Sequence, residues 1–209
     1  MLSGKGLACR RGERLVFSDL DFELAEGELL LLRGANGSGK STLLRLIAGL
    51  IQPERGVLSW QGAPITKEDY RAKLAYLGHL DATKPELTPR EDLCFWLGVR
   101  GKIRAQQAAD LTLAHLGLEG LADLPCRLLS AGQRRRLALA RILASGAKLW
   151  LLDEPFTALD EPAILAVRTM LSQHRASSGL AVMAAHGAAL ELAPSLELVL
   201  GGHAAEEKA

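Results

Sequence analysis

The sequence is poor in cysteine, with only Cys9, Cys94 and Cys126 among its 209 residues. Their number is odd and they stand far apart in the chain. The sequence therefore predicts neither a framework of disulfides nor a C-x-x-C metal pair. Three separate thiols are typical of a protein of the reducing cytoplasm.

Long apolar runs are lacking as well. The longest, "LLLLRGANG" and "LWLLDEP", are interrupted well short of the roughly 18 to 20 residues that a membrane-spanning helix needs. The N-terminus also lacks the apolar core of a signal peptide. We therefore expect any role at a membrane to depend on a partner protein.

Neither sign of charge dominates, because 25 Lys and Arg residues stand against 24 Asp and Glu residues, for a formal net charge of +1. This balance gives no general field that attracts nucleic acid, and we expect no nucleic-acid partner. Basic residues do cluster locally, at Arg10 and Arg11 and in "QRRRLALAR" (Gln133–Arg141). We interpret this clustering as a solvated helix face.

Short apolar runs alternate with longer helical patterns, which is typical of a mainly parallel sheet covered by helices. Residues 15–27 alternate apolar and polar positions, as a half-exposed antiparallel strand does, and a buried strand follows. Between about residues 81 and 145 helical patterns replace the strand signals. We predict one α/β domain, with a core at about 1–80 and 146–209 and an inserted helical subdomain at about 81–145.

The segment "GANGSGKS" matches G-x-x-x-x-G-K-[ST] and lies between a predicted strand and a predicted helix, which disfavours the alternative of a simple glycine-rich turn. Glycines let successive N–H groups wrap around a phosphate at the helix N-terminus. Lys40 is expected to reach the β and γ phosphates, and the Ser41 hydroxyl to bind Mg²⁺. The predicted nucleotide-binding residues here are Gly34, Ala35, Asn36, Gly37, Ser38, Gly39, Lys40, Ser41 and Thr42.

The apolar segment "LWLLDEP" ends in two carboxylates, Asp153 and Glu154. Acidic residues after a strand also occur as plain helix caps. Together with the phosphate loop, however, they predict that Asp153 belongs to the Mg²⁺ shell and that Glu154 orients or deprotonates the attacking water. The two motifs together predict an Mg²⁺-dependent nucleoside triphosphatase.

The segment "LSAGQ" predicts the start of a helix, with Ser130 as the N-cap and Gln133 completing a capping box. By itself, this structural explanation is sufficient. The segment also stands in a definite order, however, after the phosphate loop and before the Asp153 strand, "TALD" (Thr157–Asp160) and His186. In this order of motifs the sequence resembles the ATP-binding cassette (ABC) ATPases over nearly its whole length.

The resemblance implies a P-loop NTPase fold with a RecA-like core, an antiparallel β subdomain and a helical subdomain. It also implies ATP and Mg²⁺ as cofactors and a head-to-tail homodimer in the ATP-bound state. Ser130 and Gly132 are then expected to contact the γ phosphate on the other chain, and Asp160 to bridge the two sites. His186 is expected to hold the γ phosphate and the attacking water against Glu154.

Two positions depart from the pattern of the family. The aromatic residue that usually stacks on adenine is not evident, and Arg11 takes the equivalent place. Its planar guanidinium can stack instead, the alternative being a simple surface arginine. The usual glutamine at or next to Leu80 is missing: either His79 takes over part of its task, or Asp153, Glu154 and His186 suffice. We favour the second, because adjacent residues at a strand end point in opposite directions.

Other classes of protein fit less well. Cassette ATPases of chromosome maintenance insert a long coiled coil where this chain has only about fifty residues, and paired-cassette translation factors carry two copies of the motifs. A kinase or a GTPase leaves "LSAGQ" and His186 unexplained. A subunit that energises a membrane partner remains.

At a finer level the chain resembles the ATP-binding subunits of the cytochrome c maturation transporters, also called heme exporters. The resemblance rests on "LGH" (Leu77–His79), "KPELTPREDLCFW" (Lys84–Trp96), "LSAGQRRRLALAR" and "LLDEPFTALD". It implies two copies bound to two integral membrane permease subunits at the cytoplasmic face of the inner membrane, with heme-handling accessory membrane proteins. The alternative is the ATPase subunit of another small bacterial exporter of drugs, lipids or lipoproteins. Heme binding by this chain itself is not predicted, since no C-x-x-C-H occurs.

Overall fold

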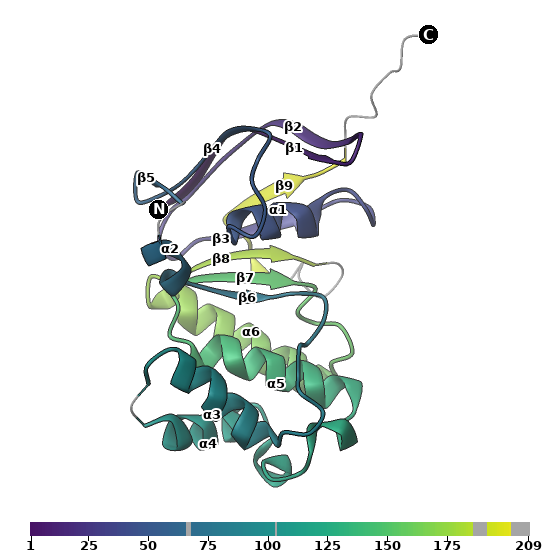
Figure 1. Cartoon of the computed structure of the whole chain (residues 1–209), viewed down its shortest axis with the longest axis vertical. Helices are drawn as coiled ribbons and strands as arrows, with labels where there is room; N and C mark the ends of the chain where they lie inside the picture. Colours follow the sequence, from purple (N-terminus) through teal and green to yellow (C-terminus); the bar gives the residue numbers. More distant parts are fainter. Residues whose placement is uncertain (66–67, 103, 186–191, 202–209) are drawn as a thin grey trace.

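The computed structural model describes residues 1–65, 68–102, 104–185 and 192–201, and its strands form two sheets (Figure 1). One sheet has the order β2-β1-β4-β5, with antiparallel neighbours throughout. The other has the order β6-β7-β8-β3-β9, with parallel neighbours throughout. The strands are β1 (Leu2–Arg11), β2 (Arg14–Leu24), β3 (Leu29–Arg33), β4 (Arg55–Trp60), β5 (Ala63–Pro64), β6 (Leu74–Leu77), β7 (Leu149–Asp153), β8 (Leu180–Ala184) and β9 (Leu196–Val199).

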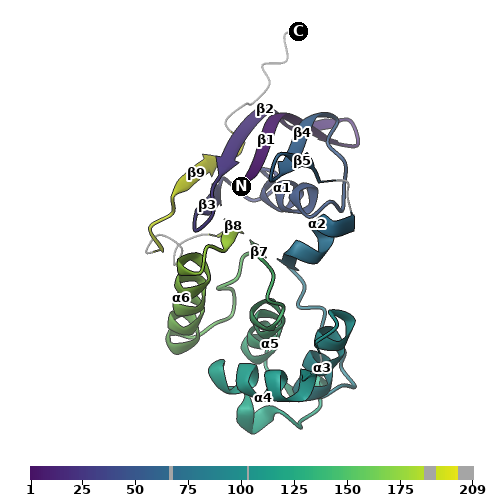
Figure 2. The same ribbon diagram turned by 90° about the vertical axis from the view of Figure 1, so that its left-hand side faces the viewer.

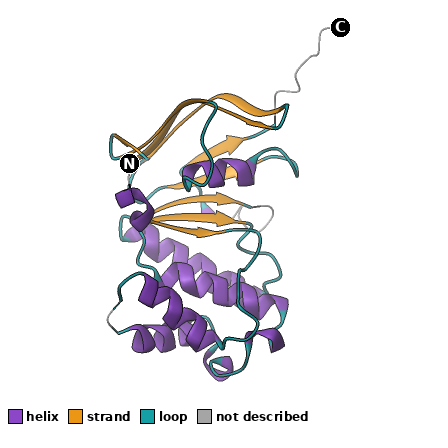
Figure 3. Ribbon diagram, in the orientation of Figure 1, coloured by secondary structure: helices purple, strands orange, loops and turns teal. Residues whose placement is uncertain are grey.

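Most of the helices lie on one side of the parallel sheet. Figure 3 shows most of them gathered on the side away from the antiparallel sheet, and Figure 2 shows the same arrangement from a second direction. The described residues between 81 and 145 contain helices and loops, while the division into a core and an inserted subdomain stays a prediction. The helices are α1 (Lys40–Ile47), α2 (Glu68–Lys73), α3 (Pro89–Val99), α4 (Ala105–His115), η1 (Glu119–Leu121), η2 (Cys126–Leu128), α5 (Ala131–Ala144) and α6 (Glu161–Ala176).

The inner strands β3, β7 and β8 are apolar except for Arg33 and Asp153 at their ends, because both faces of the sheet are covered there. On β3, Leu29 and Leu31 belong to the core shared with α3 to α6, whereas Leu30 and Leu32 belong to the core shared with α1 and the antiparallel sheet. The helix α1 therefore lies between the two sheets, as Figures 1 and 2 both show. These features match the predicted fold of an ABC-type P-loop NTPase, which is confirmed.

No helix in the described ranges is both long enough and apolar enough to span a membrane. The three cysteines are free thiols, and Cys9 and Cys126 are buried. Burial is the main cause that raises the pKa of Cys126 to about 11. This thiol is therefore neutral near pH 7.

The basic cluster on α5 is not the solvated helix face that we interpreted from the sequence. The side chain of Arg135 is only 4% exposed, and that of Arg141 is only 11% exposed. Arg141 Nε donates to Asp92 Oδ2 of α3 at 2.6 Å, and the side chain of Asp92 is 1% exposed. The interpretation was wrong for these two residues, because carboxylates and backbone carbonyls on other elements accept hydrogen bonds from their guanidiniums.

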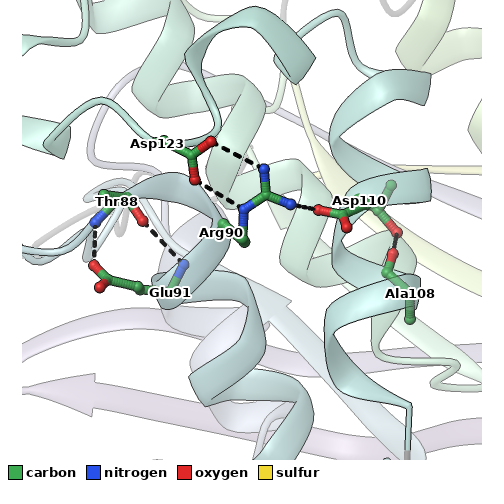
Figure 4. Close-up of polar contacts among 7 residues, drawn as sticks. Thr88, Arg90, Glu91, Ala108, Asp110 and Asp123 are labelled. Atoms are coloured by element: carbon green, nitrogen blue, oxygen red, sulfur yellow. Dashed lines mark hydrogen bonds and ion pairs between the residues drawn. The ribbon is translucent and has the colours of Figure 1, made fainter.

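A second arginine ties α3 to its surroundings at the surface (Figure 4). Arg90 contacts Asp110 of α4 and makes two hydrogen bonds to Asp123, of 2.9 and 3.1 Å. The Asp123 side chain is 78% exposed, unlike Asp92. At the start of the same helix, Thr88 and Glu91 form a capping box, also drawn in Figure 4.

Candidate functional site

Three segments that follow parallel strands meet at one edge of the sheet, which is the usual location of ligand sites in such folds. They enclose a cavity of about 430 Å³. The loop after β3 contributes residues from Asn36 to Thr42, the end of β7 contributes Asp153 and Glu154, and the loop after β6 contributes His79. The hairpin between β1 and β2 completes the wall. The structure thus brings together most of the predicted site residues.

The phosphate loop passes directly from β3 into α1, and local crowding requires two of its glycines, Gly34 and Gly39. Gly39 has a φ of 105°, and a Cβ at this position would collide with Val16 of β2. Gly34 has a φ of 139°, and a Cβ there would collide with the carbonyl oxygen of Leu200. Because Gly39 caps α1 without a side chain, the first N–H groups of that helix form a positive end suited to a phosphate.

Lys40 lies inside this loop. Its Nζ donates to the carbonyl oxygens of Gly34 at 2.7 Å and Ala35 at 3.0 Å, and the residue is buried. These two bonds draw the ammonium group back over the loop that precedes its own helix. The positive charge therefore lies among the N–H groups expected to bind phosphate.

The end of β7 supplies a carboxylate suited to Mg²⁺. Asp153 is 2% exposed, and its Oδ2 is a buried atom with no hydrogen-bond partner among the described residues. Ser41, in the first turn of α1, lines the same cavity. Mg²⁺ is usually held by one or two carboxylate or hydroxyl oxygens, with phosphates and waters completing its shell. The residues present therefore fit this ion.

Glu154 has an unusual backbone conformation. Its φ is 51°, in the left-handed region that residues other than glycine rarely adopt and that is often found at functional sites. Its N–H donates to the carbonyl oxygen of Ala184 on β8 at 2.8 Å. This conformation turns the chain sharply after Asp153 and brings Glu154 into the wall of the cavity.

Two arginines of the first hairpin line the cavity. Arg11 ends β1 and faces Arg14, which begins β2, across a two-residue turn. We predicted Arg11 from the sequence but not Arg14. The short turn "GE" between them was the signal that could have placed both at one site.

Replacing Arg11 with alanine is expected to raise the dissociation constant for ATP by about three- to tenfold, the effect of losing a cation stacked on an aromatic ring. Isothermal titration with an ATP analogue that is not hydrolysed measures the change. Arg10→Ala is the matched control, because Arg10 on the same strand pairs with Glu54 at 3.1 Å. Unchanged affinity in Arg11→Ala would make Arg11 a plain surface arginine.

His79 and Leu80 lie on opposite sides of the loop after β6. His79 lines the nucleotide-sized cavity, whereas Leu80 is 81% exposed and lines a second cavity of about 370 Å³. The expected alternation of direction is therefore present. It places the histidine on the side of the phosphate loop, which favours the alternative that His79 takes over part of the task of the missing glutamine.

The wall of the cavity at the phosphate loop does not include Ser130, Gly132 or Asp160. Ser130 is the exposed N-cap of α5, and its side chain forms the predicted capping box with Gln133. Asp160 caps α6 by accepting from Ala163 N–H at 3.1 Å. Gly132 packs against the carbonyl oxygen of Ala158, which leaves no room for a Cβ. His186 lies outside the described residues.

Comparisons with known proteins agree with this geometry. The profile of the ABC transporter family matches residues 17–157. The cytochrome c biogenesis ATP-binding export protein CcmA of Nitrosococcus oceani is 51% identical over 190 residues, which cover 90% of this chain and 86% of that protein.

Solved structures with the same fold include the ATP-binding subunit of an ABC transporter, with a TM-score of 0.85 and 27% identity. The alignment covers 95% of this chain and 85% of that one. An ATP-binding cassette solved as a dimer in a post-hydrolysis state with ADP and Pi aligns with a TM-score of 0.83 and 25% identity. That alignment covers 96% of this chain and 94% of the other.

Proposed function

This chain belongs to the ABC transporter family, and from that premise we propose that it is the ATP-hydrolysing subunit of a translocase that serves c-type cytochrome biogenesis. The complex either exports heme or releases heme from its carrier. The observation that carries the proposal is a cavity that combines the phosphate loop, Asp153 and Glu154, in a chain about half identical to a cytochrome c biogenesis export protein.

The cavity supports hydrolysis of ATP to ADP and phosphate. Lys40 and the N–H groups of Gly34–Thr42 bind the β and γ phosphates, and Ser41 and Asp153 hold Mg²⁺. When bound, this ion neutralises charge on the phosphate oxygens. The oxygen of the attacking water bonds to the γ phosphorus, and Glu154 accepts a proton from that water. The bond between the γ phosphorus and the oxygen that bridges to the β phosphate breaks, and ADP leaves. His186 is proposed to hold the same phosphate.

A second copy of the chain completes each site in this proposal. Ser130 and Gly132 stand at the exposed start of the 14-residue helix α5, whose N-terminus carries a partial positive charge. They are proposed to bind the γ phosphate held by the other copy, with Asp160 between the two sites. Support comes from their position outside the cavity of their own chain and from the likeness to the dimeric cassette with ADP and Pi.

An apolar groove supports the proposed contact with a membrane subunit. It is the 370 Å³ cavity between the end of β6, α3 and α5, and its wall includes Leu80, Trp96 and Leu97. Phe95 and Val99 add exposed apolar surface on α3. Exposed apolar surface of this kind marks interaction sites. In the proposed division of the chain, this groove joins the helical subdomain (about 81–145) to the nucleotide-binding core (about 1–80 and 146–209).

The proposed assembly contains two copies of this chain and two integral permease subunits. It lies at the cytoplasmic face of the inner membrane, where heme-handling accessory membrane proteins join it. No residue of this chain is assigned to heme, which remains the cargo of the membrane partner.

Genetic complementation tests the proposal. In a strain that lacks this chain, the wild type is expected to restore c-type cytochromes, whereas Lys40→Ala is expected to restore none, because phosphate binding is lost. Lys5→Ala is the control, since Lys5 is an exposed lysine paired with Glu23. Normal c-type cytochromes in the deletion strain, with recovery of the chain alongside a drug or lipid permease, would instead support another small exporter.

A further inference from the structure

The buried side chain of Arg135 joins the two strand ends that flank the nucleotide cavity. It extends from α5, and its Nη1 donates to the carbonyl oxygen of Gly78 at 3.1 Å and to Asp81 Oδ1 at 2.9 Å. Its Nη2 donates to the carbonyl oxygens of Asp153 at 2.5 Å and Glu154 at 2.7 Å. One guanidinium thus holds the loop after β6 and the end of β7 together.

These acceptors are adjacent to the groups that face the cavity. Gly78 immediately precedes His79, and Glu154 is itself in the wall. The left-handed backbone of Glu154 is fixed on one side by the hydrogen bond of its N–H to Ala184 and on the other by Arg135 at its carbonyl oxygen. Without the second bond, the peptide after Glu154 loses its charged donor and can rotate toward an ordinary conformation.

The fork shape of the arginine is suited to this task. A guanidinium is planar and presents its donors in fixed directions, so the positions of its acceptors are fixed relative to one another. Its charge is also costly to bury, and the carboxylate that balances it among the described residues is that of Asp81, at 2.9 Å. A purely apolar contact between α5 and the sheet would avoid that cost, which points to a positional rather than a packing role.

We propose that Arg135 is a positioning residue for ATP hydrolysis, which sets the Glu154 carboxylate and the His79 ring at their working distance from each other. The inference rests on the proposed role of Glu154 as the group that activates water. Arg135 contacts backbone carbonyls and a loop carboxylate, so it acts through Glu154 and His79 rather than on the nucleotide.

The test compares Arg135→Met and Arg135→Lys in the full-length chain, with kcat, KM and the dissociation constant for ATP measured separately. Arg135→Met is expected to lower kcat by about 10- to 100-fold, because a displacement of about 1 Å of a reacting group has effects of that size. The dissociation constant is expected to stay within about twofold of the wild-type value. Arg135→Lys keeps one charged donor and is expected to show an intermediate kcat.

Arg136→Met is the matched control. Arg136 is the next residue of the same helix and also donates to two backbone carbonyls, those of Leu116 at 3.2 Å and Gly117 at 3.3 Å, which lie outside the cavity wall. Its kcat is expected to remain within about twofold of the wild type. A general loss of helix packing would instead lower kcat in both variants.

A kcat of Arg135→Met within twofold of the wild type overturns the inference, as does an equal loss in Arg136→Met. If Arg135→Met does not fold, Arg135→Lys decides, and a wild-type kcat in that variant overturns it. Failure of the proposed function gives a different result, namely a wild-type chain without ATPase activity or a Glu154→Gln variant that stays active.

Discussion

Glu154→Gln is expected to lower the rate of ATP hydrolysis by about 100-fold or more, the usual contribution of a general base. ATP binding is expected to persist, because the phosphate loop and Asp153 remain intact. With hydrolysis blocked, the ATP-bound homodimer should accumulate. Phosphate release measures the first effect, and size-exclusion chromatography with and without ATP and Mg²⁺ measures the second.

Glu161→Gln is the control for this experiment. Glu161 is also a glutamate that follows β7, but it lies exposed in the first turn of α6. Its substitution is expected to leave hydrolysis unchanged. An active Glu154→Gln variant would remove Glu154 as the base, and a variant that stays monomeric with ATP would contradict the proposed sharing of sites between two chains.

Asp92→Ala is expected to lower the free energy of unfolding by about 3–5 kcal/mol, the typical cost of removing one partner of a buried ion pair. The carboxylate of Asp92 accepts from Arg141 Nε at 2.6 Å, and the residue is almost fully buried. Alanine at this position leaves the guanidinium without its counter-charge between α3 and α5. Urea denaturation measures the loss, which is a large part of the stability of a typical domain.

The exposed pair between Arg90, in the same first turn of α3, and Asp123 provides the comparison. Asp123→Ala removes both hydrogen bonds to Arg90, the group that holds the pKa of Asp123 below its usual value. Because Asp123 is exposed, water replaces the lost partner and only a small change in the urea midpoint is expected. An equal loss from both substitutions would mean that burial does not determine the strength of these pairs.

The sequence predicted those strands whose own residues carry a clear pattern of apolar and polar positions. The alternation in Leu15–Gly27 corresponds to β2, and the predicted buried strand after it and the apolar segment "LWLLDEP" correspond to β3 and β7. We did not predict β4 or β5. In β4 only Leu58 and Trp60 are buried, so its sequence has little apolar pattern, and its place depends on pairing with β1, about fifty residues earlier in the chain.

The residues of the site also divide into those that a continuous motif predicts and those that only the fold brings together. The phosphate loop is one continuous segment, so a motif was enough to predict its place in the cavity. Arg14 and His79 come from separate segments, and only the folded sheet brings them to the same wall. The burial of Arg135 was equally beyond the sequence, because its acceptors are mainly backbone carbonyls, which no side-chain pattern reveals.

The loop after β6 has a consequence for binding equilibria. A single peptide bond separates His79 in the wall of the nucleotide cavity from Leu80 in the wall of the apolar groove. A segment that enters the groove and shifts this loop therefore changes the affinity of the cavity for ATP. Thermodynamic linkage makes the effect reciprocal, so ATP must change the affinity for that segment by the same factor. If the proposed membrane subunit fills the groove, its binding changes the affinity of the cavity for ATP, and ATP changes the affinity of the groove for the membrane subunit.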